Sequence, residues 1–260
     1  AHHTAYRGFP SRDLALPCLT SPPTEEQDQV VSVKVYCDGA DVEEMHQAAR
    51  NPIIKGFTSN PSLMRKAGIK NYRNFAYRVI TAFPNYPVSF EVFADDFIEM
   101  ERQAREIASW GDNVYVKIPV CNTKGGSSAA LVGRLAASGI KVNVTAILCY
   151  AQIDEVCASL SDTPAVISIF AGRIADTGRS PVGIINHALK MRRFPFHEVL
   201  WASPRQALDV YTADGLGCDI ITCTPQIIEK LSLEGKNLLE YSIETVKMFH
   251  DDALAAGFTL

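Results

Sequence analysis

From about residue 31 onward, short runs of β-branched and aromatic residues alternate with longer amphipathic stretches. Short apolar runs bounded by turn residues are typical of buried strands, whereas apolar positions that recur every three or four residues are typical of helices. The pattern predicts eight strands, over 33–37, 54–58, 87–93, 113–118, 140–145, 164–170, 197–202 and 218–222. It predicts helices after the strands, among them 61–82, 95–110, 127–138 and 181–193, and a final helix near 237–256.

This order of elements determines the expected fold class. Strands that alternate with helices form a parallel sheet. Eight strand–helix units in one chain of 260 residues fit a (β/α)8 TIM barrel, which takes about 250 residues, better than a doubly wound sheet of fewer strands. Because the composition does not shift within 31–256, we expect a single α/β catalytic domain over 31–260, with an extra C-terminal helix.

Residues 1–30 differ from the rest of the chain. They contain four prolines and an acidic stretch over 25–28, without the basic start and continuous apolar region of a signal peptide. We expect a flexible or loosely docked arm there. The seven cysteines form no CxxC pair, which favours free thiols in a reducing compartment, and we therefore expect a cytoplasmic location.

Charge and motifs exclude several classes of function. The net charge is −4, no block of Lys or Arg occurs, and no apolar run approaches the length of a membrane span. We therefore expect neither nucleic acid nor a membrane as a partner. The histidines show no HxH or HExxH spacing and no glycine-rich nucleotide motif is present, so we expect no metal and no cofactor.

Lys117 is the only charged residue in the predicted strand around Val114–Ile118. Side chains alternate along a strand, so Lys117 shares a face with Tyr115, and in a barrel one of the two faces is the interior. Burial disfavours the charged form of an amine and frees its lone pair to attack a carbonyl carbon. The alternative is a strand-end lysine that reaches solvent or pairs with a carboxylate.

Other polar residues lie near the carboxyl ends of the predicted strands. Asp38 ends the first strand and Glu91 lies in the third, and a buried carboxylate needs a partner such as Lys117. Four more polar residues follow near other strand ends, namely Asn60, Thr145, Ser168 and Ser203. Some are explained as helix caps, because Asn60 and Ser203 each precede a proline. These ends also form the face where barrel active sites lie, so we expect a polar ring around Lys117.

Two arginines indicate an anion site. Arg173 follows the sixth strand, and Arg205 is expected to open the helix after the seventh. A helix N-terminus offers free N–H groups, and an arginine beside it can bind two phosphate oxygens. The late strands of this fold commonly bind phosphate. The alternative is two ordinary surface charges.

Taken together, these strand-end motifs resemble those of the transaldolases, in the branch of short transaldolase-like barrels that includes fructose-6-phosphate aldolase. The resemblance extends over nearly all of 33–250. It rests on five stretches, at 56–63 (GFTSNPSL), 116–119 (VKIP), 143–147 (NVTAI), 167–174 (ISIFAGRI) and 202–205 (ASPR).

The resemblance implies a catalytic mechanism without a cofactor. A dihydroxyacetone unit would pass from a ketose phosphate, such as sedoheptulose 7-phosphate or fructose 6-phosphate, to an aldose phosphate. Lys117 would form an imine with the donor ketone, and Asp38 would take the proton of the donor's C4 hydroxyl. Glu91 would shuttle protons through a water held by Thr145.

The resemblance also implies how the substrate is bound. Asn60 and Ser168 would hydrogen-bond the dihydroxyacetone part, and the terminal phosphate would contact Arg173, Ser203 and Arg205. The expected partners are therefore sugar phosphates, and the chain is compatible with a homo-oligomer.

Two positions separate transferases from simple aldolases within this branch. Members that act as aldolases tend to carry Gln at the position of Glu91 and Tyr at the position of Phe170, so both residues here are of the transferase type. The resemblance thus favours a transaldolase. Two alternatives stay open: an aldolase that releases free dihydroxyacetone, and a non-catalytic barrel that binds sugar phosphates.

Overall fold

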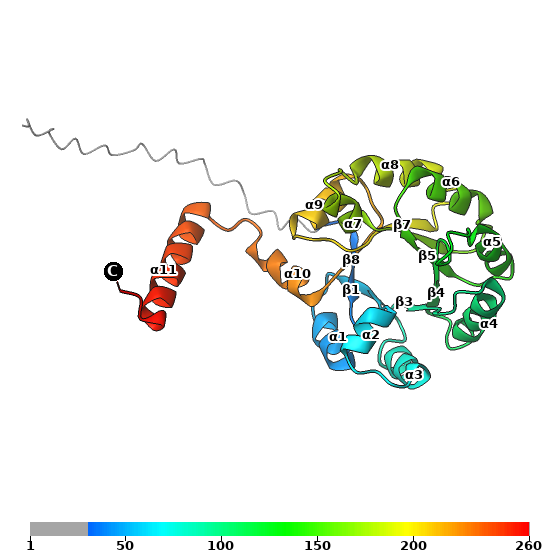
Figure 1. Ribbon diagram of the computed structural model, residues 1–260, viewed down its shortest axis with the longest axis horizontal. Helices are drawn as coiled ribbons and strands as arrows, with labels where there is room; N and C mark the ends of the chain where they lie inside the picture. Colours follow the sequence, from blue (N-terminus) through cyan, green and yellow to red (C-terminus); the bar gives the residue numbers. More distant parts are fainter. Residues whose placement is uncertain (1–30, 260) are drawn as a thin grey trace, which may run out of the picture. The chain divides into compact units, whose positions relative to one another are not determined.

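The structure, a computed structural model, describes residues 31–259, and the arm expected over 1–30 lies outside the described residues. Eight parallel strands close into a barrel in which β8 pairs with β1 (Figure 1). They are β1 (Lys34–Asp38), β2 (Ile54–Thr58), β3 (Val88–Glu91), β4 (Val114–Pro119), β5 (Val142–Ile147), β6 (Ala165–Ile169), β7 (His197–Trp201) and β8 (Ile220–Cys223). The predicted (β/α)8 barrel is confirmed.

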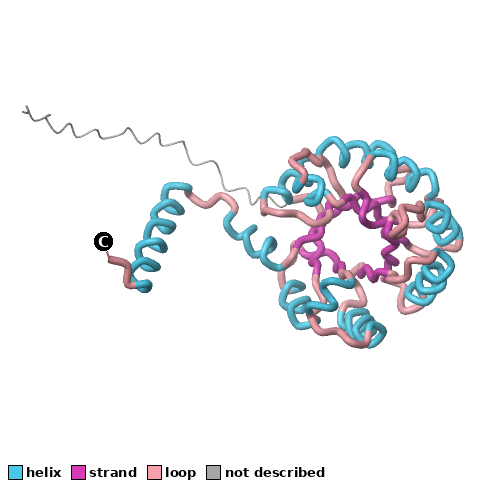
Figure 2. Tube along the Cα trace, in the orientation of Figure 1, coloured by secondary structure: helices cyan, strands magenta, loops and turns pink. Residues whose placement is uncertain are grey.

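Helices ring the strands, as Figure 2 shows in cyan around magenta. They are α1 (Val42–Ala49), α2 (Pro61–Lys66), α3 (Tyr72–Ala82), α4 (Phe97–Ala108), α5 (Ala129–Ala137), α6 (Tyr150–Ser159), α7 (Ala171–Asp176), α8 (Val182–Met191), α9 (Leu208–Gly215) and α10 (Pro225–Lys230). A short 3₁₀ helix, η1 (Leu231–Leu233), follows α10.

The single helix predicted over 61–82 is wrong, because two helices occupy this stretch. The first, α2, ends at Lys66, and Gly68 then adopts a left-handed conformation with φ of +71°. Glycine reaches this conformation without a steric penalty, so it reverses the chain before α3 begins. Between β6 and α8 the structure also contains the short helix α7, which the sequence pattern did not predict.

The alternation of side chains divides the core into two layers. Most buried apolar residues, such as Val116 and Ile118 of β4, pack between the barrel and its helices. A smaller group fills the barrel interior and includes Tyr36, Tyr115, Val166, Leu200 and Ile220. On four strands the residue two places beyond an interior apolar residue is polar, as Lys117 is to Tyr115. The apolar layer therefore closes the barrel beneath a polar layer.

The expected C-terminal helix is confirmed as α11 (Leu238–Ala256). The side chain of Asn237 caps its N-terminus, and Gly257 ends it in the left-handed conformation. None of its residues is buried, although Leu239, Ile243 and Phe249 are large and apolar. The helix therefore leaves an apolar surface exposed within the described part of the chain.

Within residues 31–259, no helix has the length and apolar character needed to cross a membrane. The six cysteines of this part of the chain are free thiols, and four of them are buried. The cytoplasmic location stays a prediction.

Candidate active site

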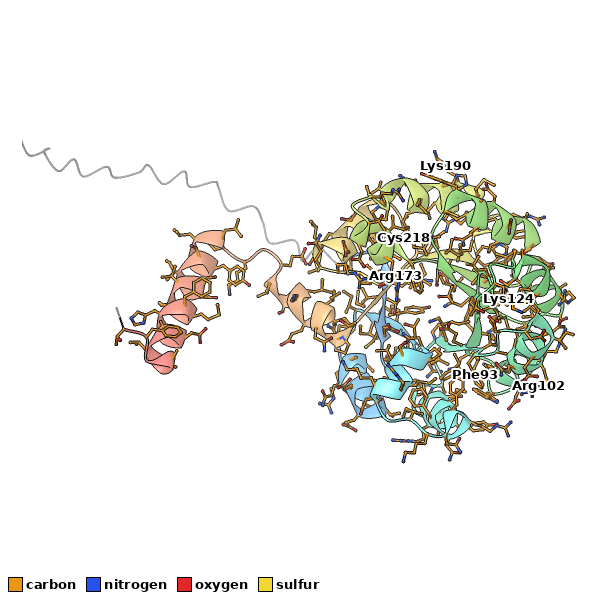
Figure 3. All side chains as sticks on the ribbon, in the orientation of Figure 1. Phe93, Arg102, Lys124, Arg173, Lys190 and Cys218 are labelled. Atoms are coloured by element: carbon orange, nitrogen blue, oxygen red, sulfur yellow. The ribbon has the colours of Figure 1, made fainter. Side chains whose placement is uncertain are left out.

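A cavity of about 570 Å³ opens at the carboxyl ends of the strands. Ten residues predicted from the sequence to serve the site all line it, namely Asp38, Asn60, Glu91, Lys117, Thr145, Ser168, Phe170, Arg173, Ser203 and Arg205. Figure 3 shows Arg173 inside the ring of helices and Lys190 on its outer side. The structure therefore brings the predicted residues together, and their individual roles stay predictions.

Lys117 lies at the centre of the charged part of this cavity. It is 7% exposed, and its Nζ lies 3.1 Å from Glu91 Oε2 and 3.0 Å from the carbonyl oxygen of Ser59. Lys117 and Glu91 face each other in register on neighbouring strands. Glu91 is the more exposed partner, and it is placed to exchange a proton with the amine. A buried amine beside a carboxylate can form a carbinolamine and dehydrate it.

Asp38 lies on the opposite wall, where it accepts a hydrogen bond of 2.8 Å from the hydroxyl of Thr58. Burial raises the pKa of the Asp38 carboxyl above its ordinary value, and nearby Glu91 adds to the rise. The charge of Lys117 and the hydrogen bond from Thr58 lower the pKa in opposition to these effects. The carboxylate is thus a stronger base than an exposed aspartate, which suits it to take a hydroxyl proton.

An amide–hydroxyl network forms the wall between these two groups and the late strands. Asn143 donates to Ser89 Oγ at 3.1 Å and accepts from Ser168 Oγ at 2.6 Å. Thr145 is 2% exposed, and no group within 31–259 hydrogen-bonds its hydroxyl. A buried hydroxyl needs a partner, so Thr145 is suited to hold a water or a substrate oxygen.

Asn60 combines the two roles that the sequence left open. Its Oδ1 accepts from the backbone N–H of Leu63 at 3.0 Å and so caps α2, while Pro61 takes the first helical position. The cap uses only the carbonyl oxygen of the side-chain amide, which leaves the NH₂ group to donate into the cavity. Asn60 is therefore both a cap and a cavity residue.

The expected position of Arg205 at a helix N-terminus is wrong. Arg205 lies in the loop before α9, and its backbone N–H donates to Asp209 Oδ2 at 2.6 Å. Its guanidinium forms two bonds with the carboxylate of Asp176, including one of 3.0 Å from Nε. Asp176, at the end of α7, therefore orients the Arg205 side chain, and the dipole of a helix plays no part.

The loop that carries Arg205 is packed tightly against α7. Ser203 has a φ of +60°, which is uncommon for a residue other than glycine. It is not the helix cap that its proline neighbour suggested, because α9 begins at Leu208 and Ala207 takes the N-cap position. A Cβ at Gly172 would lie 1.5 Å from the carbonyl oxygen of Ser203, so only glycine fits there. Strained backbone of this kind is often found at functional sites. Here it holds Ser203 and Arg205 beside Arg173.

Sequence reasoning missed several residues of the cavity. Thr58, Asn143 and Thr222 all line it, and Lys66 of α2 lies at its edge. A signal was available, because each of the first three lies two residues before or after an interior position on its strand. In the described residues, no group of three or more His, Cys, Asp or Glu side chains is placed to hold a metal ion.

Comparison with known proteins identifies relatives of this chain. The profile of the family described as transaldolase/fructose-6-phosphate aldolase matches residues 35–259. A protein named "Probable transaldolase" from Bdellovibrio bacteriovorus is 31% identical over 222 residues, covering 85% of this chain and 97% of its own length. A second of that name, from Dehalococcoides mccartyi, is 30% identical over 201 residues, covering 76% of this chain and 90% of its own.

Solved structures agree on the fold. The 3-hexulose-6-phosphate synthase of Salmonella typhimurium superimposes with a TM-score of 0.55 at 13% identity, covering 76% of this chain and 91% of that protein. A putative phosphonomutase from Burkholderia cenocepacia also gives a TM-score of 0.55, at 10% identity, covering 83% and 94%. At this level of identity, the likeness shows a shared barrel and nothing about the reaction.

Proposed function

The chain belongs to the transaldolase/fructose-6-phosphate aldolase family and is an enzyme of the aldolase type, and from that premise we propose that it is a transaldolase. It transfers a dihydroxyacetone unit from a ketose phosphate, such as sedoheptulose 7-phosphate or fructose 6-phosphate, to an aldose phosphate. The relatives named as probable transaldolases support this proposal, and so does the cavity that holds an amine, two carboxylates and two arginines.

In the first half of the reaction, the Lys117 amine adds to the donor's carbonyl carbon and gives a carbinolamine. Loss of water from the carbinolamine gives an imine, and Glu91, 3.1 Å from the amine, transfers the protons through a water held by Thr145. Asp38 then takes the C4 hydroxyl proton. The C3–C4 bond breaks, its electrons pass into the imine to form an enamine, and the shortened aldose phosphate leaves.

In the second half, the enamine attacks the aldehyde carbon of the acceptor, whose oxygen takes back the proton from Asp38. Water then hydrolyses the new imine, which releases a ketose phosphate three carbons longer than the acceptor and restores the Lys117 amine. Asn60 and Ser168 hydrogen-bond the dihydroxyacetone part, while Arg173, Ser203 and Arg205 contact the terminal phosphate. These five side chains line the same cavity as the amine.

The contact between Lys117 and Glu91 carries the proposal. A barrel that only binds sugar phosphates needs no buried amine next to a carboxylate, because this arrangement costs desolvation without adding a phosphate contact. Borohydride reduction in the presence of fructose 6-phosphate, followed by intact-mass measurement, tests it. We expect a three-carbon adduct on the protein, and the absence of any adduct would leave the binding-protein alternative.

Arg205→Ala is expected to lower kcat/KM selectively for phosphorylated substrates. A charge-assisted contact contributes about 1.5–3 kcal/mol and exists only when the phosphate is present. Because Asp176 already orients the guanidinium, the full contact is available to the substrate. We therefore expect kcat/KM for fructose 6-phosphate to fall roughly 10- to 100-fold, and kcat/KM for unphosphorylated fructose to change little.

Lys190→Ala serves as the matched control, because Lys190 is an exposed cation on the outer ring of helices (Figure 3). It should leave both substrates unaffected. Equal losses for the two substrates in Arg205→Ala would make Arg205 a structural residue.

We also propose that the protein is a homo-oligomer in which α11 docks on a second copy. The apolar residues Leu239, Ile243, Val246 and Phe249 recur at helical spacing on one exposed side of α11. The described barrel offers a hollow of about 210 Å³ between α3 and α4, where Tyr72, Phe93, Ile107 and Trp110 form an apolar floor and polar side chains complete the lining, namely Arg73, Arg102, Gln103 and Glu106.

Charge supports a second copy as the occupant of this surface. Residues 61–82, beside the hollow, contain five basic residues and no acidic one, whereas α11 contains four acidic residues and only Lys247 as a base. Opposite charges on two apolar surfaces favour their association. The acidic helix of one copy therefore complements the basic α2–α3 edge of another.

Light scattering coupled to size exclusion tests this arrangement. The wild type should be an oligomer, and Ile243→Glu combined with Phe249→Glu should dissociate it, because two charges would be placed in the apolar interface. Met248→Glu, on the side of α11 opposite Leu239 and half exposed, is the control and should leave the oligomer intact. A monomeric wild type would contradict the proposal.

A further inference from the structure

A chain of buried hydroxyl groups leads from β8 to Asp38. Thr222 Oγ1 lies 2.5 Å from Thr58 Oγ1, which lies 2.8 Å from Asp38 Oδ1. The three residues lie on the adjacent strands β8, β2 and β1, with β1 between the other two. Thr58 is 3% exposed and Thr222 is 7% exposed. Both side chains line the cavity but expose little of their surface, and within the described residues Thr222 bonds only Thr58, while Thr58 also bonds Asp38.

The chemistry of the groups determines which hydroxyl donates in each of these hydrogen bonds. A hydroxyl has one hydrogen to donate, and an ionised carboxylate has none. Thr58 uses its hydrogen for Asp38, so the hydrogen between the two threonines comes from Thr222. Every donor in the chain thus points toward the carboxylate, and each bond polarises the next. Without Thr222, the Thr58 hydroxyl is free to rotate away from Asp38.

The surroundings of Asp38 make this support important. Burial raises the pKa of its carboxyl, and so does the carboxylate of Glu91 on β3, while Lys117 on β4 and the hydroxyl of Thr58 on β2 lower it. The thiols of Cys37 on β1 and of Cys223 on β8 lie nearby, and burial raises the pKa of both, so they stay neutral. Of the groups that favour the ionised form, Thr58 is thus the only one that hydrogen-bonds the carboxylate in the described residues.

We propose that Thr222 is a positioning residue for Asp38, acting through Thr58. It directs the Thr58 hydrogen at Oδ1 and so holds the carboxylate in one orientation. In the part of the chain that the structure describes, Oδ2 takes no hydrogen bond and is the oxygen left to receive the proton of the substrate hydroxyl. This inference rests on the proposed role of Asp38 in cleaving the C3–C4 bond.

Thr222→Val and Thr222→Ser form a matched pair of variants. Valine keeps the branched shape of threonine but lacks the hydroxyl, whereas serine keeps the hydroxyl and loses only a methyl group. For Thr222→Val we expect kcat with fructose 6-phosphate and an aldose acceptor to fall about five- to tenfold at pH 7, with KM near the wild-type value. Thr222→Ser should restore most of kcat.

The pH profile separates positioning from packing. Loss of the donor destabilises the Asp38 carboxylate, so the carboxyl holds its proton to a higher pH and a smaller fraction is active at a given pH. The acidic limb of kcat should therefore move upward by about half a unit to one unit in Thr222→Val. It should stay in place in Thr222→Ser.

Borohydride trapping gives a second readout. Formation of the imine does not require Asp38, but cleavage does, so Thr222→Val should trap more of the uncleaved ketose phosphate adduct and less of the three-carbon adduct. An equal loss of kcat in both variants with unchanged pH limbs would overturn the proposal and make Thr222 a packing residue. A higher KM with an unchanged pH profile would overturn it in favour of direct contact with the substrate.

A direct titration makes the test independent of the proposed reaction. The carboxylate band of Asp38, identified by its loss in Asp38→Asn, is followed by difference infrared spectroscopy in the wild type and in Thr222→Val without substrate. An upward shift in the variant supports the proposal, and an unchanged midpoint overturns it. Failure of the transaldolase proposal would appear elsewhere, as a wild-type protein that traps no adduct.

Discussion

Lys117→Met is expected to abolish both turnover and borohydride trapping while the barrel stays folded. The imine requires a primary amine at this place, and Lys117 is the lysine buried at the bottom of the cavity, against Glu91 and the carbonyl of Ser59. Methionine has a similar length and fills the same space without an amine. Loss of the covalent intermediate should lower kcat by on the order of 10³-fold or more.

The fold is expected to survive this change for an electrostatic reason. Removal of one partner from a fully buried ion pair destabilises a protein by about 3–5 kcal/mol. Glu91, however, is 18% exposed and lines the cavity, so its carboxylate keeps water or takes up a proton. We therefore expect unfolding free energy to fall by only about 1–2 kcal/mol, measured by denaturant titration.

Two controls separate loss of the nucleophile from loss of the charge. Lys117→Arg keeps a cation beside Glu91 but has no amine that forms an imine, and should be as inactive as Lys117→Met. Lys124→Met removes an exposed lysine in the loop after β4 (Figure 3) and should be fully active. Turnover of Lys117→Met within about tenfold of the wild type would remove Lys117 from the mechanism.

Phe170→Tyr is expected to convert the enzyme partly from a transferase into an aldolase. The Phe170 ring lines the cavity, with the guanidinium carbon of Arg173 5.8 Å from its centre, and it packs on the apolar interior of the barrel. A hydroxyl on this ring would add a donor and acceptor near the water that hydrolyses the imine. A positioned acid–base group contributes about 10²-fold or more, so release of free dihydroxyacetone should rise by up to this factor.

The measurement is the release of dihydroxyacetone from fructose 6-phosphate with and without an aldose phosphate acceptor. Wild-type enzyme should release little without an acceptor, and Phe170→Tyr should release more while transfer to the acceptor falls. Phe196→Tyr, which alters a partly exposed ring just before β7 and outside the cavity, should behave like the wild type. Glu91→Gln should slow imine formation but leave substrate binding largely intact.

One result would decide against the transferase. If the wild type releases dihydroxyacetone as fast without an acceptor as it turns over with one, the enzyme is an aldolase. The Glu91 and Phe170 pair would then not distinguish the two activities in this chain.

Local patterns in the sequence were enough to predict the architecture. The period of two along each apolar run placed Lys117 and Tyr115 on one face, and the structure confirms that this face is the barrel interior. Strand boundaries agree within a few residues because buried β-branched runs and the turns between them depend on neighbouring residues only. The helix break at Gly68 is also local in origin, and an Ala-Gly pair after Lys66 was its signal.

Only the tertiary structure decided which side chains meet. Thr222 and Thr58 are 164 residues apart and come within 2.5 Å because closure of the barrel places β8 beside β1. Asp176 and Arg205 likewise meet because α7 packs against the loop after β7. From the sequence alone, a threonine in an apolar strand indicates only a residue that favours strands, and an aspartate at a helix end indicates only a surface charge. Periodicity along a strand determines the face on which a residue lies, but neighbours across the barrel are set by closure, which depends on the packing of all eight strands at once.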